Sequence, residues 1–373
     1  MSDTQAFVPP VPGTGAVQLA AGPSSATVAA GGEPAATGPL LEVTELVTYY
    51  PVRRAMTDAV ARRPRRFVRA VDGVSFSLNR GEMLALVGES GCGKTSTVQT
   101  ILGMVKPTSG VVRLNGREIT GLPDRQMRPL RRTVQMIYQD PYESLDPRFR
   151  VRQTVEEPML VHGIGSSRAE RQDLIVKALE QAGLRPAEMY LDRYPHELSG
   201  GQRQRVAIAT SLVLGPQLLL ADEPVSMLDV SVRAGVLALL DSLRKTADMG
   251  ILMITHDLST AAHFADQIAV MYLGRIVEQG GAAEIVRNPQ HPYTKALLSA
   301  APTLEDKLFD PGDFLLEGEP PSPIDIPAGC SFASRCPKAF GRCRVETPKL
   351  VEHSPGRLVA CHLLDSSEAK AAA

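Results

Sequence analysis

The sequence predicts an α/β fold with a parallel sheet, and two observations favour it. Three short segments are continuously apolar, as strands are when helices cover both faces of a sheet: residues 84–87, 217–221 and 251–255. Helical patterns separate them, after Gly93, at about 201–214 and at 231–247. Strands that alternate with helices pair in parallel, because each helix returns the chain across the sheet.

Composition narrows the classes of function. The chain has 373 residues, of which 43% are hydrophobic, so it can form one large domain with an extension, or two domains. Lys and Arg total 40 while Asp and Glu total 41, and this balance argues against a general attraction to nucleic acid or anionic lipid. No apolar run reaches the roughly 18–20 residues that span a bilayer, and the start does not resemble a secretion signal. We therefore expect a cytoplasmic location.

Changes in composition along the chain predict its organisation. Residues 1–39 are mostly Ala, Gly, Pro, Ser, Thr and Val, which predicts a disordered tail. Further strands are predicted at 41–50, 67–79 and 134–138. An amphipathic helical segment at 166–214 interrupts the alternation. A linker rich in Pro, Gly and acidic residues at 302–329 precedes a cysteine-rich segment at 330–362.

An insert between the first two predicted strands is rich in arginine. Its arginines are Arg53, Arg54, Arg62, Arg63, Arg65 and Arg66. Two interpretations fit it: a solvated hairpin loop, or a contact with phosphate or lipid headgroups.

A glycine-rich loop follows the strand at 84–87 and precedes a helix. It reads GESGCGKT: Gly88, Glu89, Ser90, Gly91, Cys92, Gly93, Lys94 and Thr95. In this context the pattern predicts a phosphate-binding loop. The glycines let backbone N–H groups point at phosphate oxygens, and the helix N-terminus adds its dipole. We expect Lys94 to reach the β- and γ-phosphates of a nucleotide, Thr95 to ligate Mg²⁺, and Ser96 to lie beside the phosphates.

Acidic and polar side chains follow three of the predicted strands. Asp222 and Glu223 come after the second apolar segment, and the carboxyl ends of such strands are where a nucleotide's metal sits. Asp222 is predicted to hold Mg²⁺, and Glu223 to polarise the attacking water as a general base. His256 follows the third apolar segment and is predicted to contact the γ-phosphate. Gln139 is predicted to ligate Mg²⁺ and to sense the nucleotide.

A second possible anion-binding helix start lies in the sequence LSGGQ. Its polar and small residues are Ser199, Gly200, Gly201 and Gln202. It is either a capped helix start or a site for another molecule. Since the chain already has one phosphate-binding loop, the second interpretation predicts a dimer, in which this turn closes over the γ-phosphate bound by the partner subunit.

These motifs, in this order and spacing, resemble the nucleotide-binding subunit of an ABC transporter. The sequences GESGCGKT, LSGGQ and LLLADEP carry the resemblance, together with Gln139, Asp229 and His256. The resemblance implies ATP and Mg²⁺ as ligands, hydrolysis that uses Glu223, His256 and Lys94, and a role for Asp229 in communication across a dimer.

The resemblance also implies an aromatic side chain stacked on adenine near the first strand. Tyr50 fits this role best and Tyr49 next. In the segment SMLD, Met227 replaces the alanine that is familiar in the family.

The implied fold is a P-loop NTPase of the ABC ATPase type. It has a RecA-like mixed-sheet core, an antiparallel β subdomain and an α-helical subdomain, here followed by a Cys-rich C-terminal extension. The ATPase domain is expected at 40–285, with its helical subdomain at about 140–214. The extension is expected at 286–362, and a disordered tail at 363–373.

Further segments resemble the ATPase subunits of oligopeptide and dipeptide permeases. They are QDPYESLDPR, YPHELSGGQRQR, NPQHPYTKALL and the terminal cysteines. This resemblance implies a bacterial importer with two transmembrane permease subunits, an extracellular substrate-binding protein and a second, related ATPase subunit; a homodimer is the alternative. The subunit would lie at the cytoplasmic face of the cell membrane and bind no nucleic acid. Oligosaccharides or metal complexes are alternative cargoes, and a soluble ABC ATPase acting on ribosomes or nucleic acid is the rival function.

Four of the five cysteines lie near the end of the chain: Cys330, Cys336, Cys343 and Cys361. A reducing compartment argues against disulfides. Their spacing is neither the C-x₂-C of zinc ribbons nor a common ferredoxin pattern. The peptide-permease resemblance implies that they hold a 4Fe–4S cluster. Zinc and unligated thiols are the alternatives.

Overall fold

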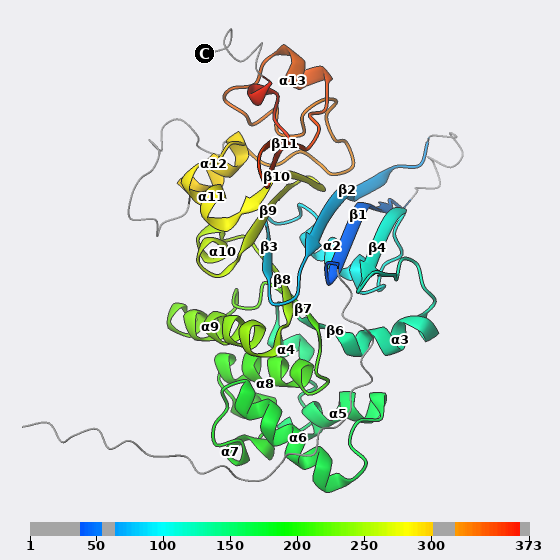
Figure 1. Cartoon of the computed structure of the whole chain (residues 1–373), viewed down its shortest axis with the longest axis vertical. Helices are drawn as coiled ribbons and strands as arrows, with labels where there is room; N and C mark the ends of the chain where they lie inside the picture. The colour runs from blue at the N-terminus through cyan, green and yellow to red at the C-terminus, as the bar shows by residue number, and fades with distance from the viewer. Residues whose placement is uncertain (1–37, 54–63, 301–317, 366–373) are drawn as a thin grey trace, which may run out of the picture. The chain divides into compact units, whose positions relative to one another are not determined.

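The computed structural model describes residues 38–53, 64–300 and 318–365. The predicted N-terminal tail lies outside these ranges, apart from its last two residues, and so do most of the arginine-rich insert and most of the predicted linker. Within the described ranges the chain forms two sheets with helices around them (Figure 1). No helix in these ranges is long and apolar enough to cross a membrane.

The first sheet is antiparallel and has the order β2-β1-β4-β5. Its strands are β2 (Phe67–Leu78), β1 (Leu41–Pro51), β4 (Ser109–Leu114) and β5 (Arg117–Glu118). The predicted strands at 41–50 and 67–79 are confirmed within one residue. This sheet is the antiparallel β subdomain that the resemblance implied.

The second sheet is mixed and has the order β11-β12-β10-β9-β3-β8-β7-β6. The strands are β11 (Val351–Ser354), β12 (Arg357–Val359), β10 (Arg275–Gly281), β9 (Gln267–Tyr272), β3 (Met83–Val87), β8 (Gly250–Thr255), β7 (Leu218–Asp222) and β6 (Val134–Ile137). The five strands from β9 to β6 pair in parallel, which confirms the parallel core. β10, β12 and β11 continue the sheet in antiparallel fashion.

The parallel strands read as continuously apolar because two cores cover them. In β3, Ala85 and Val87 belong to a core shared with the helices around α9, while Leu84 and Leu86 belong to a core shared with α2 and the antiparallel sheet. All five residues of β3 are buried. The central strand therefore has no solvent face, as the sequence pattern predicted.

Helices cover the parallel strands and fill the connections. They are α2 (Lys94–Ile101), α3 (Asp124–Thr133), α4 (Pro141–Ser144), α5 (Val151–His162), α6 (Arg168–Gln181), α7 (Glu188–Leu191), α8 (Gly200–Leu212), α9 (Val230–Ala247), α10 (Leu258–Phe264), α11 (Ala282–Arg287), α12 (Pro292–Ser299) and α13 (Gly341–Val345). α5, α6 and α8 pack on one another between β6 and β7 in the chain (Figure 1), the region where a helical subdomain was predicted.

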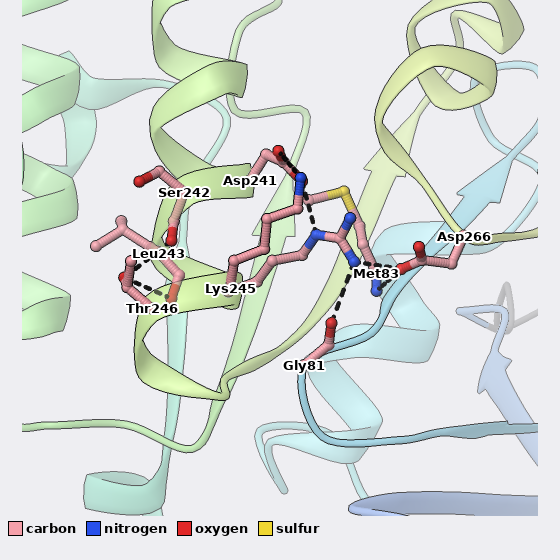
Figure 2. A network of polar contacts seen from close by, with 9 residues as sticks. Gly81, Met83, Asp241, Ser242, Leu243, Lys245, Thr246 and Asp266 are labelled. Carbon is pink, nitrogen blue, oxygen red and sulfur yellow. Dashed lines mark hydrogen bonds and ion pairs between the residues drawn. The ribbon is translucent and has the colours of Figure 1, made fainter.

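A polar network fixes α9 against the start of β3 (Figure 2). The guanidinium of Arg244 donates to Asp241 at 2.8 Å and to the carbonyl of Gly81 at 3.1 Å, and it pairs with Asp266. Asp266 also accepts from the backbone N–H of Met83 at 2.8 Å. The Arg244 side chain is only 10% exposed, so this network fixes the amino end of the central strand.

The C-terminal segment joins the main sheet through a buried ion pair. β12 pairs with β10, with Val359 opposite Glu278. The Glu278 side chain is fully buried and accepts from Arg357 at 2.6 Å, and also from the backbone N–H groups of Gln290 and His291. These three donors belong to β12 and to the residues just before α12. The carboxylate of Glu278 therefore holds both segments at this edge of the sheet.

We predict that Arg357→Met destabilises the protein by about 3–5 kcal/mol, because it leaves the buried Glu278 carboxylate without its counter-charge. Chemical or thermal unfolding of the purified chain measures this. Glu278→Gln combined with Arg357→Met should recover part of the loss, since a neutral amide needs no counter-charge and its oxygen still accepts one of the two backbone N–H bonds. Arg117→Met, in the exposed β5, is the matched control. A loss no larger than that of the control would contradict the prediction.

Candidate nucleotide site

The loop between β3 and α2 has a shape that only glycine allows. A Cβ on Gly88 would lie 2.2 Å from the carbonyl oxygen of Met271, and one on Gly93 would lie 1.9 Å from that of Ala70. Gly93 also has φ 109°, in the left-handed region. α2 begins at Lys94, directly after this turn. The predicted strand–loop–helix context of the phosphate-binding motif is therefore present.

Lys94 lies inside the loop. Its ammonium donates to the carbonyls of Gly88 at 2.7 Å and Glu89 at 2.9 Å, and the residue is 5% exposed. The positive charge is thus held among the loop's backbone groups, next to the start of α2. This is the position from which it can reach the terminal phosphates of a nucleotide.

Asp222 and Thr95 form a site suited to a divalent cation. Asp222 is the last residue of β7, one position earlier relative to the strand end than the apolar pattern at 217–221 predicted. The pKa of the Asp222 carboxyl group is raised, and burial is the largest cause. A hydrogen bond from the Thr95 hydroxyl acts in the opposite direction and lowers this pKa. Asp222 Oδ1 is buried and has no hydrogen-bond partner in the described ranges. A buried, unpartnered carboxylate oxygen beside a hydroxyl fits Mg²⁺, which prefers hard oxygen ligands.

Glu223 is held between two of the other predicted site residues. Its carboxylate is 3.2 Å from His256 Nδ1 and accepts from Gln139 Nε2 at 3.1 Å. Its backbone has φ 44°, unusual for a residue with a side chain. Such strain costs on the order of 1–3 kcal/mol and concentrates at functional sites. The turn thus directs the carboxylate toward His256 and Gln139.

A cavity of about 860 Å³ is lined by most of these groups, though Gly88 and Asp222 are not part of its lining. Its lining includes these predicted residues: Tyr50, Glu89, Ser90, Gly91, Gly93, Lys94, Thr95, Ser96, Gln139, Glu223 and His256. Tyr49, the second choice for adenine stacking, instead donates its hydroxyl to Asp72, and its pKa is raised to about 12, first by burial and then by Asp72. Leu297 and Pro323 also line the cavity. Leu297 belongs to the segment NPQHPYTKALL, which indicated the family but not a contact with the nucleotide, and no local motif marks Pro323.

The LSGGQ turn and Asp229 lie elsewhere in the fold. Ser199 caps α8: its hydroxyl accepts from the Gln202 N–H at 3.3 Å, and Gln202 Oε1 accepts from the Ser199 N–H. Within the described ranges, residues 199–202 do not line the nucleotide cavity. Asp229 precedes α9 beside two exposed apolar side chains, Met227 and Val230.

The loop cysteine, Cys92, is buried beneath the phosphate-binding loop. A Cβ on Gly88 would lie 2.8 Å from its Sγ, so the thiol fills the space under the start of the loop. Burial is the largest influence on the Cys92 thiol and raises its pKa, while the charge of Lys94 lowers it. Cys92 therefore packs the loop from below, and it does not line the nucleotide cavity.

The four terminal cysteines lie in one neighbourhood. The N–H of Cys330 donates to the carbonyl of Cys343 at 2.8 Å. Burial, followed by smaller effects of the other three thiols, raises the pKa of Cys361 to about 12. In the part of the chain that the structure describes, however, no group of three or more His, Cys, Asp or Glu side chains could hold a metal ion. The predicted 4Fe–4S site therefore gains no support from the described residues.

Comparison with known proteins identifies the family. The family described as ABC transporter matches residues 71–226, and the family described as oligopeptide/dipeptide transporter, C-terminal region, matches residues 277–343. The dipeptide transport ATP-binding protein DppF of Escherichia coli (strain K12) is 45% identical over 335 residues, 88% of this chain and 96% of its own. The putative oligopeptide transport ATP-binding protein YkfD of Bacillus subtilis (strain 168) is 44% identical over 333 residues, 89% of this chain and 98% of its own.

Solved structures agree with this assignment. The ATP-binding cassette MJ0796, a dimer in a post-hydrolysis state bound to ADP and Pi, has a TM-score of 0.57 and 26% identity, covering 65% of this chain and 98% of its own. CbiO1 from Clostridium perfringens, part of the ABC transporter complex cbiONQ, also has a TM-score of 0.57. It is 29% identical, and the match covers 66% of this chain and 90% of the CbiO1 chain. The chain therefore belongs to the ABC transporter family, among the ATP-binding proteins of oligopeptide and dipeptide transport.

Proposed function

We propose that this chain is the ATP-hydrolysing subunit of a bacterial importer for oligopeptides or dipeptides. The observation that carries the proposal is the cavity in which Lys94, Glu223 and His256 meet. The match of residues 277–343 to the peptide-transporter C-terminal region and the names of the relatives support a peptide cargo. Oligosaccharides and metal complexes are the alternative cargoes.

The proposed hydrolysis uses each side chain in one role. The loop N–H groups and Lys94 bind the phosphates of ATP, and Tyr50 stacks on the adenine. Thr95 and Asp222, with Gln139, would hold Mg²⁺, which when bound neutralises charge on the phosphates.

Glu223 accepts a proton from the attacking water as the water oxygen bonds to the γ-phosphorus. The bond from that phosphorus to the β–γ bridging oxygen breaks, and ADP leaves with the electron pair. His256, 3.2 Å from the Glu223 carboxylate, donates to the γ-phosphate and keeps this geometry. Gln139, which donates to the same carboxylate, is placed to respond when the nucleotide enters.

The position of the LSGGQ turn supports a dimer. Because Ser199–Gln202 lie outside the cavity that holds Lys94, we propose that they complete the site of a second ATPase subunit, with Asp229 at the contact between subunits. That second subunit is a related chain, or a copy of this one. Two transmembrane permease subunits and an extracellular binding protein complete the complex, with this chain at the cytoplasmic face of the membrane.

We predict that Glu223→Gln lowers the rate of ATP hydrolysis by roughly 10²–10⁴-fold, because the amide cannot accept a proton from water. ATP binding should persist, since the phosphate-binding loop is unchanged. Phosphate release and equilibrium ATP binding measure the two effects. Glu118→Gln, in the exposed β5, is the control. Hydrolysis at the wild-type rate in Glu223→Gln would disprove the assigned role.

The cargo is tested by reconstituting the chain with its permease subunits and binding protein in lipid vesicles. We expect dipeptides or oligopeptides to stimulate ATP hydrolysis and to accumulate inside the vesicles. Stimulation by oligosaccharides or nickel complexes, without any effect of peptides, would support the alternative cargo. ATP hydrolysis without membrane partners, but stimulated by ribosomes or nucleic acid, would favour the rival function.

The sequence pattern of the cysteines, rather than their arrangement, supports an iron–sulfur cluster. If Cys330, Cys336, Cys343 and Cys361 hold a 4Fe–4S cluster, protein purified without oxygen should contain about four iron atoms and about four acid-labile sulfides per chain. Stoichiometric zinc without iron would indicate the zinc alternative, and the absence of both metals would indicate unligated thiols.

A further inference from the structure

Glu89, the second residue of the phosphate-binding loop, is held at three points. Its carboxylate accepts two bonds from Arg335, at 2.7 Å and 3.0 Å. Its backbone N–H donates to the Tyr293 hydroxyl at 2.9 Å, and its carbonyl accepts from Lys94 at 2.9 Å. A loop residue held by its side chain, its N–H and its carbonyl has little freedom to move.

Arg335 comes from the cysteine-rich segment, 246 residues beyond Glu89. Its side chain is 5% exposed, whereas that of Glu89 is 26% exposed. An aromatic cluster anchors the segment beside the loop: the ring of Phe332 lies 5.3 Å from that of Tyr272 and 5.4 Å from that of Tyr293. Movement of this segment would therefore take the guanidinium away from Glu89.

Residues 320–323, which precede the cysteine-rich segment in the chain, also lie beside the loop. Residues 320–323 and the loop residues 89–92 line one small cavity of about 190 Å³. The carbonyl of Pro323 accepts from the Arg69 N–H at 2.9 Å, and Pro323 lines the nucleotide cavity as well. Residues 320–323 and the cysteine-rich segment thus both lie beside the phosphate-binding loop. Together they are called the C-terminal segment below.

The charge of Glu89 gives this contact an energetic consequence. A carboxylate in a loop that binds phosphates repels them, because both groups are negative. The planar guanidinium of Arg335 pairs with both carboxylate oxygens and so offsets the repulsion.

We propose that Arg335 is a positioning residue for ATP binding: it neutralises and orients Glu89, and thereby couples the C-terminal segment to the nucleotide. Coupling of this kind is reciprocal, so the nucleotide must stabilise the segment as much as the segment favours the nucleotide. The inference rests on the proposed ATP site but is independent of the transported cargo.

The test measures binding of the Mg²⁺ complex of a non-hydrolysable ATP analogue to the full chain. Arg335→Met should weaken binding roughly tenfold, within the range of ordinary coupling energies. Adding Glu89→Gln to it should restore most of the affinity, because the repelling charge is gone. Arg342→Met is the matched control: it breaks ion pairs with Glu346 and Asp365 within the same segment.

Glu89→Gln alone keeps the proposal testable if Arg335→Met does not fold. It should bind the analogue at least as tightly as the wild type, since the charge that repels the phosphates is gone. Hydrogen exchange provides the reciprocal measurement: the analogue should slow exchange at residues 330–336 in the wild type and much less in Arg335→Met.

Unchanged affinity in Arg335→Met would overturn the proposal, as would a double variant that binds as weakly as Arg335→Met. Either result would leave Arg335 with a merely structural role. A wild-type chain that does not bind the analogue would instead overturn the ATP site itself, so the two failures are distinguishable.

Discussion

The parallel register of four strands determines where the phosphate-binding and catalytic groups of the nucleotide site lie. Val87 pairs with Thr255, Asp222 with Ile254, and Ile137 with Ala221. The strands therefore end together, and the residues that follow them meet at one edge of the sheet. A slip of one residue would turn each side chain to the opposite face. The site depends on this register because its members are scattered along the sequence.

Local patterns were enough to predict the parallel core and the groups at its edge. The apolar segments predicted β3, β7 and β8 within one residue, since burial on both faces leaves a clear signal. The two tyrosines at the end of β1 were harder to tell apart by pattern alone. The structure places Tyr50 at the cavity, whereas the Tyr49 hydroxyl donates to Asp72.

Long-range pairings could not be predicted in the same way. The pairing of Arg335 with Glu89 joins two motifs that were both recognised, yet nothing local in either indicates that they meet. The same holds for β12, a three-residue strand whose partner is set by the buried pair of Arg357 and Glu278. The pattern weakens after residue 280 because short helices and strands there depend on tertiary contacts rather than on their own periodicity.

The pairing of β12 with β10 also affects how the protein is made. Arg357 leaves the ribosome 79 residues after Glu278, so β10 is synthesised long before its neighbour exists. During that interval the edge of the sheet has unpaired backbone groups, which can pair with another chain. A nascent chain must therefore keep this edge protected until β11 and β12 emerge, and the sheet is completed only then.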